Sequence, residues 1–362
     1  MNDLAHVTTP AFLVDRNIVE QNCARMRRKA LDSGVSFRPH VKTHKTVEIA
    51  RMQHGGAAGP ITVSTLAEGE FFADAGFEDI TWAVPIAPEK LERAAALARR
   101  IRQFNLLLDN EATLRALEKV GGPFDVFLEV DCGDHRTGVD PADARSAALA
   151  AAIAHSPAVR FRGLLTHAGH SYHARNVEEI LPIARQESEC LARFRERLGM
   201  PKLVRSVGST PTASVVDRFR DTDEIRPGNY VFYDAFQAAI GSCRLADCAV
   251  SVLATVIGSY PERGEAVIDA GALALSKDLG PDHIDPQFGY GVVCDLELRP
   301  LADRLVALSQ EHGKLKTSRA PAIGERLRII PNHSCLTAAL YDVDAVIEGG
   351  RIVAEWRPVR GW

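Results

Sequence analysis

The sequence has no run of about 18 consecutive apolar residues, the length that a membrane-spanning helix needs. Its first residues, Met1–Leu4, are not a basic region followed by an apolar stretch, so no secretory leader is expected. Basic and acidic side chains nearly balance at a formal net charge of −4, and no dense basic stripe could neutralise a phosphate backbone. These absences predict a cytoplasmic protein whose partners include neither a membrane nor a nucleic acid.

Paired cysteines are missing as well. The seven cysteines are odd in number, scattered, and never spaced as Cys-x-x-Cys, which argues against a disulfide framework. We expect most of them to be reduced, and six to be small buried hydrophobic residues. These six are Cys23, Cys132, Cys190, Cys243, Cys248 and Cys294. The seventh, Cys335, belongs to a metal-binding pattern.

No Gly-x-Gly-x-x-Gly follows an early apolar run, which disfavours an open doubly wound sheet built to bind a dinucleotide. Instead, eight short β-branched and apolar runs alternate with longer alanine- and charge-rich stretches, a pattern typical of a closed (β/α)8 barrel. The predicted strands are Val35–Lys42, Ile61–Thr65, Asp79–Pro85, Phe104–Asp109, Phe124–Asp131, Phe161–Gly169, Leu203–Ser209 and Glu224–Phe232. The predicted helices include Glu89–Gln103, Glu111–Val120, Pro141–His155 and Asn176–Leu198.

The helical periodicity nearly disappears after about residue 240, and strands separated by Gly, Pro and Asp replace it. The sequence therefore predicts an α/β chain of two domains: a TIM-type barrel over 1–240 and a mainly antiparallel β domain over 241–362. The early run Ala11–Asp15 could pair with the β domain or cover the bottom of the barrel. Predicted strands of the β domain are Cys248–Tyr260, Glu265–Ala270, Gly289–Asp295, Leu327–Pro331 and Val343–Glu355.

A lysine at the end of the first barrel strand is difficult to explain by packing. Lys42 lies within Arg38-Pro39-His40-Val41-Lys42-Thr43-His44-Lys45. If this lysine is buried or half-buried, loss of hydration lowers the pKa of its ammonium group and makes the neutral amine accessible. Such an amine suits a Schiff base with a carbonyl compound. The structural alternative is a strand that ends at the solvent with two ordinary surface lysines.

The ends of the seventh and eighth strands carry the features of a phosphate site. In barrels, backbone amides and a helix start after these two strands often bind an anion. Glycines and hydrogen-bond donors occur at both ends, and each alone is also an everyday turn. Because strands one, seven and eight meet in a closed barrel, a lysine opposite an anion site suggests pyridoxal phosphate (PLP). The candidate residues are Ser209, Thr210, Gly228, Asn229 and Tyr230.

Two further strand ends offer side chains to such a cofactor. Arg136 follows the fifth strand and could donate to an anionic oxygen of the cofactor or substrate. It could equally be a surface arginine paired with Asp131 or Asp134. After the sixth strand, His167 and Tyr172 stand in a histidine-rich segment, where a ring could stack on the cofactor and the hydroxyl could donate to it.

The β domain carries a two-residue metal pattern in Pro331-Asn332-His333-Ser334-Cys335. On a strand, residues two apart face the same side, so His333 and Cys335 would converge on one point. One nitrogen and one sulfur ligand favour zinc, and two protein ligands leave open positions for catalysis. The alternative is a core histidine beside a small buried thiol. The polar loop 310–313 could line the same site.

These motifs occur in one order along nearly the whole chain, which resembles the eukaryotic-type D-serine dehydratase and D-threonine aldolase family. Its members are fold-type III PLP enzymes related to alanine racemase. The resemblance implies a homodimer whose active site lies between a barrel and the partner's β domain. It also implies that Lys42 is the Schiff-base lysine. The motifs are Thr9–Phe12, RPHVKTHK (38–45), TLAEGEFFADAGFEDI (65–80), EVDCGDHRTGV (129–139), GLLTHAGHSY (163–172), VGSTPT (207–212), RPGNYVFYD (226–234), QEHG (310–313) and PNHSC (331–335).

The resemblance assigns roles to the remaining candidates. The residues that resemble contacts of the cofactor phosphate are Thr210, Gly228 and Asn229. Those that resemble contacts at the side of the cofactor ring are His167 and Tyr172. Arg136 resembles the arginine that lies near the phenolic oxygen of the cofactor. His333 and Cys335 resemble the zinc pair of the dehydratases.

Two reactions follow from that family. Cleavage of Cα–H and loss of the β-hydroxyl would give a 2-keto acid and ammonia, with Lys42 as the base. Cleavage of Cα–Cβ would give glycine and an aldehyde. A cysteine ligand favours zinc and therefore the dehydratase, because the aldolases generally use manganese or magnesium. We expect a D-3-hydroxy amino acid such as D-serine as substrate. A racemase, or a PLP carrier without catalysis, are alternatives.

Overall fold

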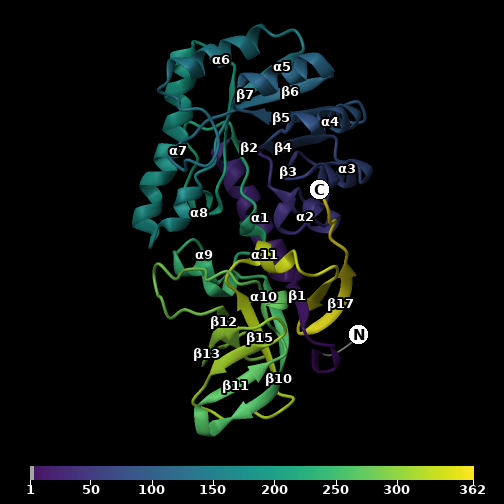
Figure 1. Cartoon of the computed structure of the whole chain (residues 1–362), viewed down its shortest axis with the longest axis vertical. Helices are drawn as coiled ribbons and strands as arrows, with labels where there is room; N and C mark the ends of the chain where they lie inside the picture. Colours follow the sequence, from purple (N-terminus) through teal and green to yellow (C-terminus); the bar gives the residue numbers. More distant parts are fainter. Residues whose placement is uncertain (1–3) are drawn as a thin grey trace. The chain divides into compact units, whose positions relative to one another are not determined.

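The computed structural model describes residues 4–362 and divides the chain into two compact units. One unit contains Ala24–Gly228 and the last four residues, and is called here the barrel unit. The other contains the chain up to Cys23 together with Asn229–Pro358, and is called the β unit. Each unit has its own sheet (Figure 1).

The barrel unit is built on eight parallel strands in the order β2-β9-β8-β7-β6-β5-β4-β3. A parallel bridge between His40 and Thr62 joins the two ends of this order, so the sheet closes on itself. The predicted TIM-type barrel is therefore confirmed. The strands are β2 Ser36–Phe37, β3 Ile61–Val63, β4 Asp79–Pro85, β5 Gln103–Leu108, β6 Phe124–Glu129, β7 Val159–Leu165, β8 Val204–Val207 and β9 Glu224–Ile225.

Helices connect the strands and lie outside the sheet (Figure 1). Side-chain caps begin several of them: Asn110 accepts from the Thr113 amide at 2.9 Å, and Asn176 accepts from the Glu179 amide at 3.0 Å. The left-handed Gly199 ends the longest helix, as only glycine adopts that backbone without strain. The helices are α1 Arg16–Ser33, α2 Val47–Gln53, α3 Leu66–Asp74, α4 Leu91–Ala98, α5 Glu111–Val120, α6 Ala144–His155, α7 Val177–Leu198 and α8 Thr210–Val215.

The inside of the barrel combines apolar packing with a buried ion-pair network. Leu107, Phe127 and Leu165 pack together from β5, β6 and β7. Arg38 follows β2, is 3% exposed, and contacts Glu224 and Asp79 at 2.6 Å each. Both carboxylates neutralise the guanidinium, so the charge can remain buried.

The β unit contains a closed antiparallel barrel and three further strands that extend the sheet from one strand of the barrel. Six strands form the ring, because β10 pairs with both β11 and β15 and the order between them is β11-β14-β13-β12-β15. The extension is β1-β16-β17, in which β1 pairs with β10 antiparallel and with β16 parallel. The strands are β1 Ala11–Asp15, β10 Val250–Tyr260, β11 Glu265–Ile268, β12 Gly291–Cys294, β13 Pro300–Leu308, β14 Gly313–Lys316, β15 Arg326–Pro331, β16 Asp344–Glu348 and β17 Arg351–Trp356.

This arrangement decides between the two alternatives for the early run Ala11–Asp15, which pairs within the β unit. It also adds two strands, β13 and β14, that the sequence pattern did not predict, and it divides the predicted strand Val343–Glu355 into the antiparallel pair β16 and β17. Short helices follow some strands: α9 Ala235–Ala239, α10 Ala272–Leu275 and α11 Ser334–Ala338. Within residues 4–362, no helix has the length and apolar character required to cross a bilayer.

Candidate functional site

Lys42 lies in a 3-10 turn, Val41–Thr43, at the carboxyl end of β2. His40 begins this turn, and its Nδ1 accepts from the Lys42 amide at 3.4 Å. The neighbours Val41, Thr43 and His44 are buried, whereas the lysine side chain is exposed. The condition that Lys42 be buried or half-buried is therefore not met within the single chain. The reason is that β2 ends at Phe37, so the lysine stands on the turn beyond the strand and not on the strand itself.

Three histidines near Lys42 are held in the neutral form. Burial lowers the pKa of His40 well below its usual value, and the charges of Lys42 and Arg226 lower it further. Burial also lowers the pKa of His44 to about 3. For His167, burial and then the charges of Lys42 and Arg136 lower the pKa to about 3. These imidazoles therefore add no charge to a region that already contains three cationic side chains.

The cationic groups make this region suitable for an anion. Arg226 is 5% exposed, and burial lowers the pKa of its guanidinium to about 10. Its Nε donates to Ser206 Oγ at 2.8 Å and its Nη2 donates to the Thr166 carbonyl oxygen. A cofactor with a phosphate and a phenolate oxygen would supply the negative charge that Lys42, Arg136 and Arg226 favour. The residues present thus fit PLP.

The predicted phosphate cradle lies where β8 and β9 end. Ser209 and Thr210 are buried at the start of α8, and Ser209 Oγ is 2.7 Å from Ser171 Oγ. Gly228 packs directly against the end of β2, because a Cβ there would lie 3.0 Å from the His40 Cβ. This close approach explains the glycine and brings the end of the eighth strand next to the turn that carries Lys42.

Glu187 of α7 is a site residue that the sequence pattern did not predict. It is 3% exposed and accepts from the Gly208 amide at 3.0 Å, the Ala168 amide at 3.3 Å and Thr212 Oγ1 at 2.9 Å. Burial raises the pKa of its carboxyl, although these donors oppose the rise. Its signal in the sequence is a carboxylate on the apolar face of α7, one turn before the buried Leu191.

Glu187 connects the ends of β7 and β8. His167 precedes Ala168, and its Nδ1 is hydrogen-bonded to the Gly208 carbonyl oxygen. The carboxylate therefore fixes the two segments that contain His167 and the Ser209–Thr210 cradle.

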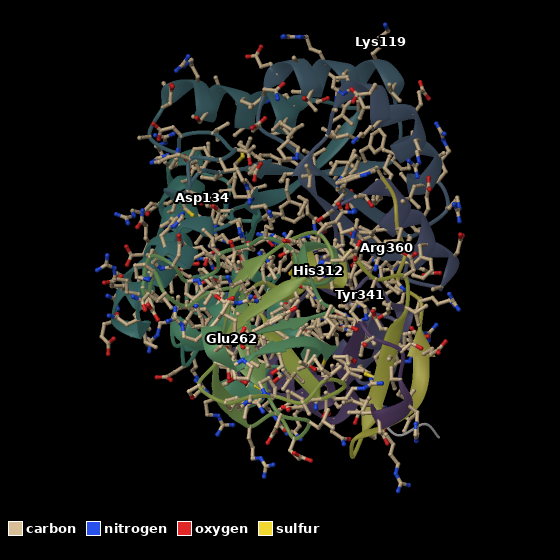
Figure 2. The ribbon with its side chains drawn as sticks, turned by 60° about the horizontal axis from the view of Figure 1, so that its bottom comes forward. Lys119, Asp134, Glu262, His312, Tyr341 and Arg360 are labelled. Atoms are coloured by element: carbon tan, nitrogen blue, oxygen red, sulfur yellow. The ribbon has the colours of Figure 1, made fainter. Side chains whose placement is uncertain are left out.

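Arg136 and Tyr172 occupy the loops after β6 and β7. Arg136 is exposed, and its Nε lies 3.9 Å from Asp134, so the pairing with Asp134 is present. Asp134, labelled in Figure 2, also packs against Gly169, which has no room for a Cβ. Tyr172 is half-buried in the 3-10 segment Gly169–His173. These loops can approach a ligand at the carboxyl end of the barrel, as the roles given to Arg136 and Tyr172 require.

In the β unit, the predicted metal-binding pair is His333 and Cys335. They do not lie on a strand as predicted: β15 ends at Pro331, His333 begins α11, and Cys335 is in its first turn. The two side chains nevertheless form a hydrogen bond, and His333 Nδ1 is 3.2 Å from Asp278 Oδ2. Burial would lower the pKa of His333, but Asp278 and Cys335 together raise it to about 11.

A buried carboxylate holds this segment in place. Asp234 is 1% exposed, and its Oδ2 accepts from the Ser334 amide at 3.0 Å and from Asn229 Nδ2 at 2.7 Å. Asn229 Nδ2 also lies 3.7 Å from Cys335 Sγ. The Asn229 amide group therefore supports the histidine–cysteine segment, and Tyr230 beside it is fully buried.

The donor set fits a divalent cation with two protein ligands. Imidazole and thiolate are borderline and soft donors, and Asp278 and Asp234 add negative charge around them. Among residues 4–362, no group of three or more His, Cys, Asp and Glu side chains is placed to hold a metal ion. A metal ion held by His333 and Cys335 alone would keep open coordination positions.

The loop 310–313 contacts the first turn of α10. The Leu273 amide donates to the Gln310 carbonyl oxygen at 3.1 Å, and Gly271 leaves room for the loop backbone. Helix α10 is bonded to α11 through Thr337 Oγ1 and the Leu275 carbonyl oxygen at 3.0 Å. His312 is exposed at this loop (Figure 2). The loop is therefore linked to the helix of Cys335 through one intermediate element.

Comparison with known proteins gives two family matches. The family described as "Alanine racemase, N-terminal domain" matches residues 14–235, and the one described as "Putative serine dehydratase domain" matches residues 249–347. Among characterised relatives, the D-threo-3-hydroxyaspartate dehydratase of Delftia sp. (strain HT23) is 39% identical, over 99% of each chain. The D-serine dehydratase of Dictyostelium discoideum is 36% identical, over 100% of this chain and 99% of that protein. The D-threonine aldolase of Arthrobacter sp. is 30% identical, over 98% of this chain and 92% of that protein.

Solved structures agree with these matches. The D-threo-3-hydroxyaspartate dehydratase from Delftia sp. HT23 superposes with a TM-score of 0.94 at 38% identity, covering 100% of both chains. A cysteine-to-alanine mutant of D-threo-3-hydroxyaspartate dehydratase, in the metal-free form, superposes with a TM-score of 0.93 at 38% identity, again over 100% of both chains.

Proposed function

The chain belongs to the D-serine dehydratase and D-threonine aldolase family of PLP-dependent lyases, and we propose that it dehydrates D-serine or a related D-3-hydroxy amino acid. The products would be a 2-keto acid and ammonia. The observation that carries the proposal is the contact between the His333 imidazole and the Cys335 thiol in a chain that matches two dehydratases over its full length.

When bound, PLP withdraws electrons from the Cα of the amino acid. The Lys42 amine would attach the cofactor, and the remaining candidates would hold its phosphate, ring and phenolic oxygen. Those candidates are Ser209, Thr210, Gly228, Asn229 and Tyr230 at the phosphate end, His167 and Tyr172 at the ring, and Arg136 at the phenolic oxygen. Support comes from the buried hydroxyls of Ser209 and Thr210 and from the cations around His167.

Lys42 Nζ would remove the proton from Cα. Because His40, His44 and His167 are all kept neutral, none of them adds positive charge beside the lysine. His167 would instead contribute a flat, uncharged face whose orientation is fixed by its bond to the Gly208 carbonyl oxygen. Glu187 would keep that carbonyl and the phosphate cradle in register.

We further propose that His333 and Cys335 bind zinc. Asp278 engages His333 Nδ1, which leaves Nε2 as the ligand nitrogen. A thiolate ligand selects zinc over magnesium or manganese, and zinc is a Lewis acid that assists departure of a β-hydroxyl. The solved relatives include alanine mutants at a histidine and a cysteine two positions apart, the spacing of His333 and Cys335, and the cysteine mutant is in a metal-free form.

The test is a substrate panel with the purified PLP-loaded protein. D-serine, D-threonine and D-threo-3-hydroxyaspartate are each scored for keto acid and for aldehyde, and bound metal is measured by mass spectrometry. We expect keto acid and about one zinc per chain. Cys335→Ser should lose zinc and turnover while keeping the visible absorbance of the cofactor, and Lys42→Ala should lose that absorbance. Glycine plus aldehyde without keto acid would overturn the dehydratase assignment.

The aldolase outcome is the second candidate, since the D-threonine aldolase of Arthrobacter sp. also matches nearly the full length. It would be recognised in the same panel by aldehyde and by activation with manganese. We also propose, from the family resemblance, a homodimer with shared active sites, located in the cytoplasm.

A further inference from the structure

A cavity of about 360 Å³ opens between α7, α8 and the segment 216–222 of the barrel unit. Its volume is at the lower end of the range of small-molecule sites. Much of its lining is apolar: Leu181 and Ala184 come from α7, Val207 from β8, Ala213 from α8 and Phe219 from the segment that follows. None of the residues proposed to hold PLP lines this cavity.

Three arginines also line the cavity: Arg185, Arg218 and Arg220. All three are exposed, and within residues 4–362 no carboxylate lies within ion-pair distance of any of them. Other arginines of α7 are paired, since Arg193 lies 2.8 Å from Glu189 and Arg195 lies 3.3 Å from Asp223. The three guanidinium groups around the cavity are therefore available to a ligand.

The acidic groups of the lining do not cancel this charge. They are Asp217 and Glu187. Burial lowers the pKa of Lys29, and the negative charge of Asp217 acts on that lysine and opposes the fall. Glu187 is buried, and its oxygens accept hydrogen bonds from Gly208, Ala168 and Thr212. The cavity thus combines an apolar floor with an excess of unpaired guanidinium groups, which are strong donors to phosphate and carboxylate.

We propose that this cavity is a second ligand site, which binds a small organic anion with an apolar body, such as the phosphate ester of an aromatic alcohol. The anionic group would lie among the three arginines and the apolar part on the floor. The proposal is independent of the dehydratase function, because no candidate catalytic residue takes part in it. Its lining includes Glu187 together with Gly208 and Thr212, both of which donate to the Glu187 carboxylate, so a bound ligand would contact the supports of the phosphate cradle.

The test is calorimetric titration of the PLP-loaded protein with phenyl phosphate. Phenol, which has only the apolar part, and inorganic phosphate, which has only the anionic part, are titrated in parallel. We expect phenyl phosphate to bind at least about tenfold more tightly than either, because only it uses both the charge and the floor. Arg218→Ala and Arg185→Ala should each weaken binding about tenfold, as loss of one charge-assisted hydrogen bond does. Ala184→Leu, which fills the floor while keeping every charge, should weaken phenyl phosphate but not inorganic phosphate.

Arg99→Ala is the matched control, since Arg99 is exposed at the end of α4 and does not line the cavity. It should bind phenyl phosphate as the unchanged protein does. Equal affinity in the arginine variants and in the unchanged protein would refute the site, as would phenyl phosphate binding no more tightly than phosphate. Circular dichroism of each variant establishes that it is folded.

Discussion

His44 shows how one buried side chain makes stability depend on pH. It is 2% exposed, and its Nδ1 accepts from the Thr46 amide at 3.1 Å. Burial lowers the pKa of this imidazole to about 3, whereas an unfolded chain would have the ordinary value of 6.5. Above pH 6.5 the imidazole is neutral in both the folded and the unfolded state, so its contribution to the free energy of unfolding is fully present. As the pH falls from 6.5 towards 3, only the unfolded state takes up the proton, and stability is lost.

Replacement of His44 by asparagine should reduce this acid sensitivity. The Asn side-chain oxygen can accept from the Thr46 amide without a titrating group. In urea unfolding at pH 7 and pH 5, the unchanged protein should lose about 2 kcal/mol more than His44→Asn between the two pH values. The same pH slope in both proteins would show that His44 is protonated in the folded state.

Glu187 predicts a larger effect at the same scale. Glu187→Ala would leave the buried Gly208 and Ala168 amides without an acceptor, whereas Thr212 Oγ1 would keep the Ser209 carbonyl oxygen at 3.3 Å. Each unpaired donor costs about 1–3 kcal/mol. We expect a loss of at least about 2 kcal/mol in the free energy of unfolding, and a clearly smaller loss for Glu187→Gln, which keeps one acceptor oxygen. Weaker PLP binding by Glu187→Gln, measured by equilibrium dialysis, would show that the carboxylate positions the cradle. An alanine variant as stable as the unchanged protein would exclude this role.

Candidate site residues could be predicted from the sequence only where a reactive or hydrogen-bonding side chain lies at the predicted end of a strand. The ends of β2, β8 and β9 do meet, so the combination of Lys42 with an anion cradle followed from barrel geometry alone. Glu187 could not be found, because a carboxylate on a helix is ordinarily a solvated side chain, and only the fold places it against the Gly208 amide. The exposure of Lys42 depends on where β2 ends, which periodicity does not locate.

At the scale of elements, α8 is held at both ends. Its first residue, Thr210, belongs to the predicted phosphate cradle, and its last turn is bonded by Lys29 of α1. Lys29 Nζ donates to the Ala213 and Ser214 carbonyl oxygens at 3.0 and 2.8 Å. A lysine at this end complements the helix dipole and fills carbonyls that have no partner within the helix.

Lys29→Met should therefore loosen α8 while keeping the apolar part of the side chain. We expect a loss of about 1–2 kcal/mol in the free energy of unfolding and faster hydrogen exchange in α8. The control is Lys119→Met, because Lys119 lies in the last turn of α5, is exposed and forms no ion pair within residues 4–362 (Figure 2). It should change stability by less than about 0.5 kcal/mol. Unaltered exchange in α8 of Lys29→Met would contradict the role of this lysine.

Strands could be predicted from the sequence where a single hydrophobic pattern dominates the segment. Asp79–Pro85 was predicted with the bounds that β4 has, because its apolar run is flanked by polar turns. Strand β13 was not predicted, since Leu301-Ala302-Asp303-Arg304-Leu305 mixes buried and exposed charges, and Asp303 is buried through its pair with Arg319. The histidine–cysteine pair was predicted on a strand, but β15 ends at Pro331, and only a helix start brings the two side chains together.

At the scale of the whole molecule, the proposed shared active sites predict complementation between inactive chains. Lys42→Ala lacks the barrel lysine, and Cys335→Ala lacks the metal ligand. If each site combines the barrel of one chain with the β domain of its partner, a mixed dimer contains one complete site. Unfolding and refolding the two variants together should then restore activity, up to about a quarter of the unchanged protein for random pairing of two equal populations. Refolding each variant alone is the control, and a mixture that stays inactive would place each site within one chain.

The position of β1 has a consequence for biosynthesis. This strand is made first, yet its two neighbours, β10 and β16, begin at residues 250 and 344. At ordinary ribosomal speeds it waits on the order of tens of seconds for the second of them. During that time the parallel barrel, whose strands end at residue 225, has already left the exit tunnel. An apolar strand with both edges open can pair with wrong partners, so we expect early chaperone binding near β1 to favour correct folding of the nascent chain.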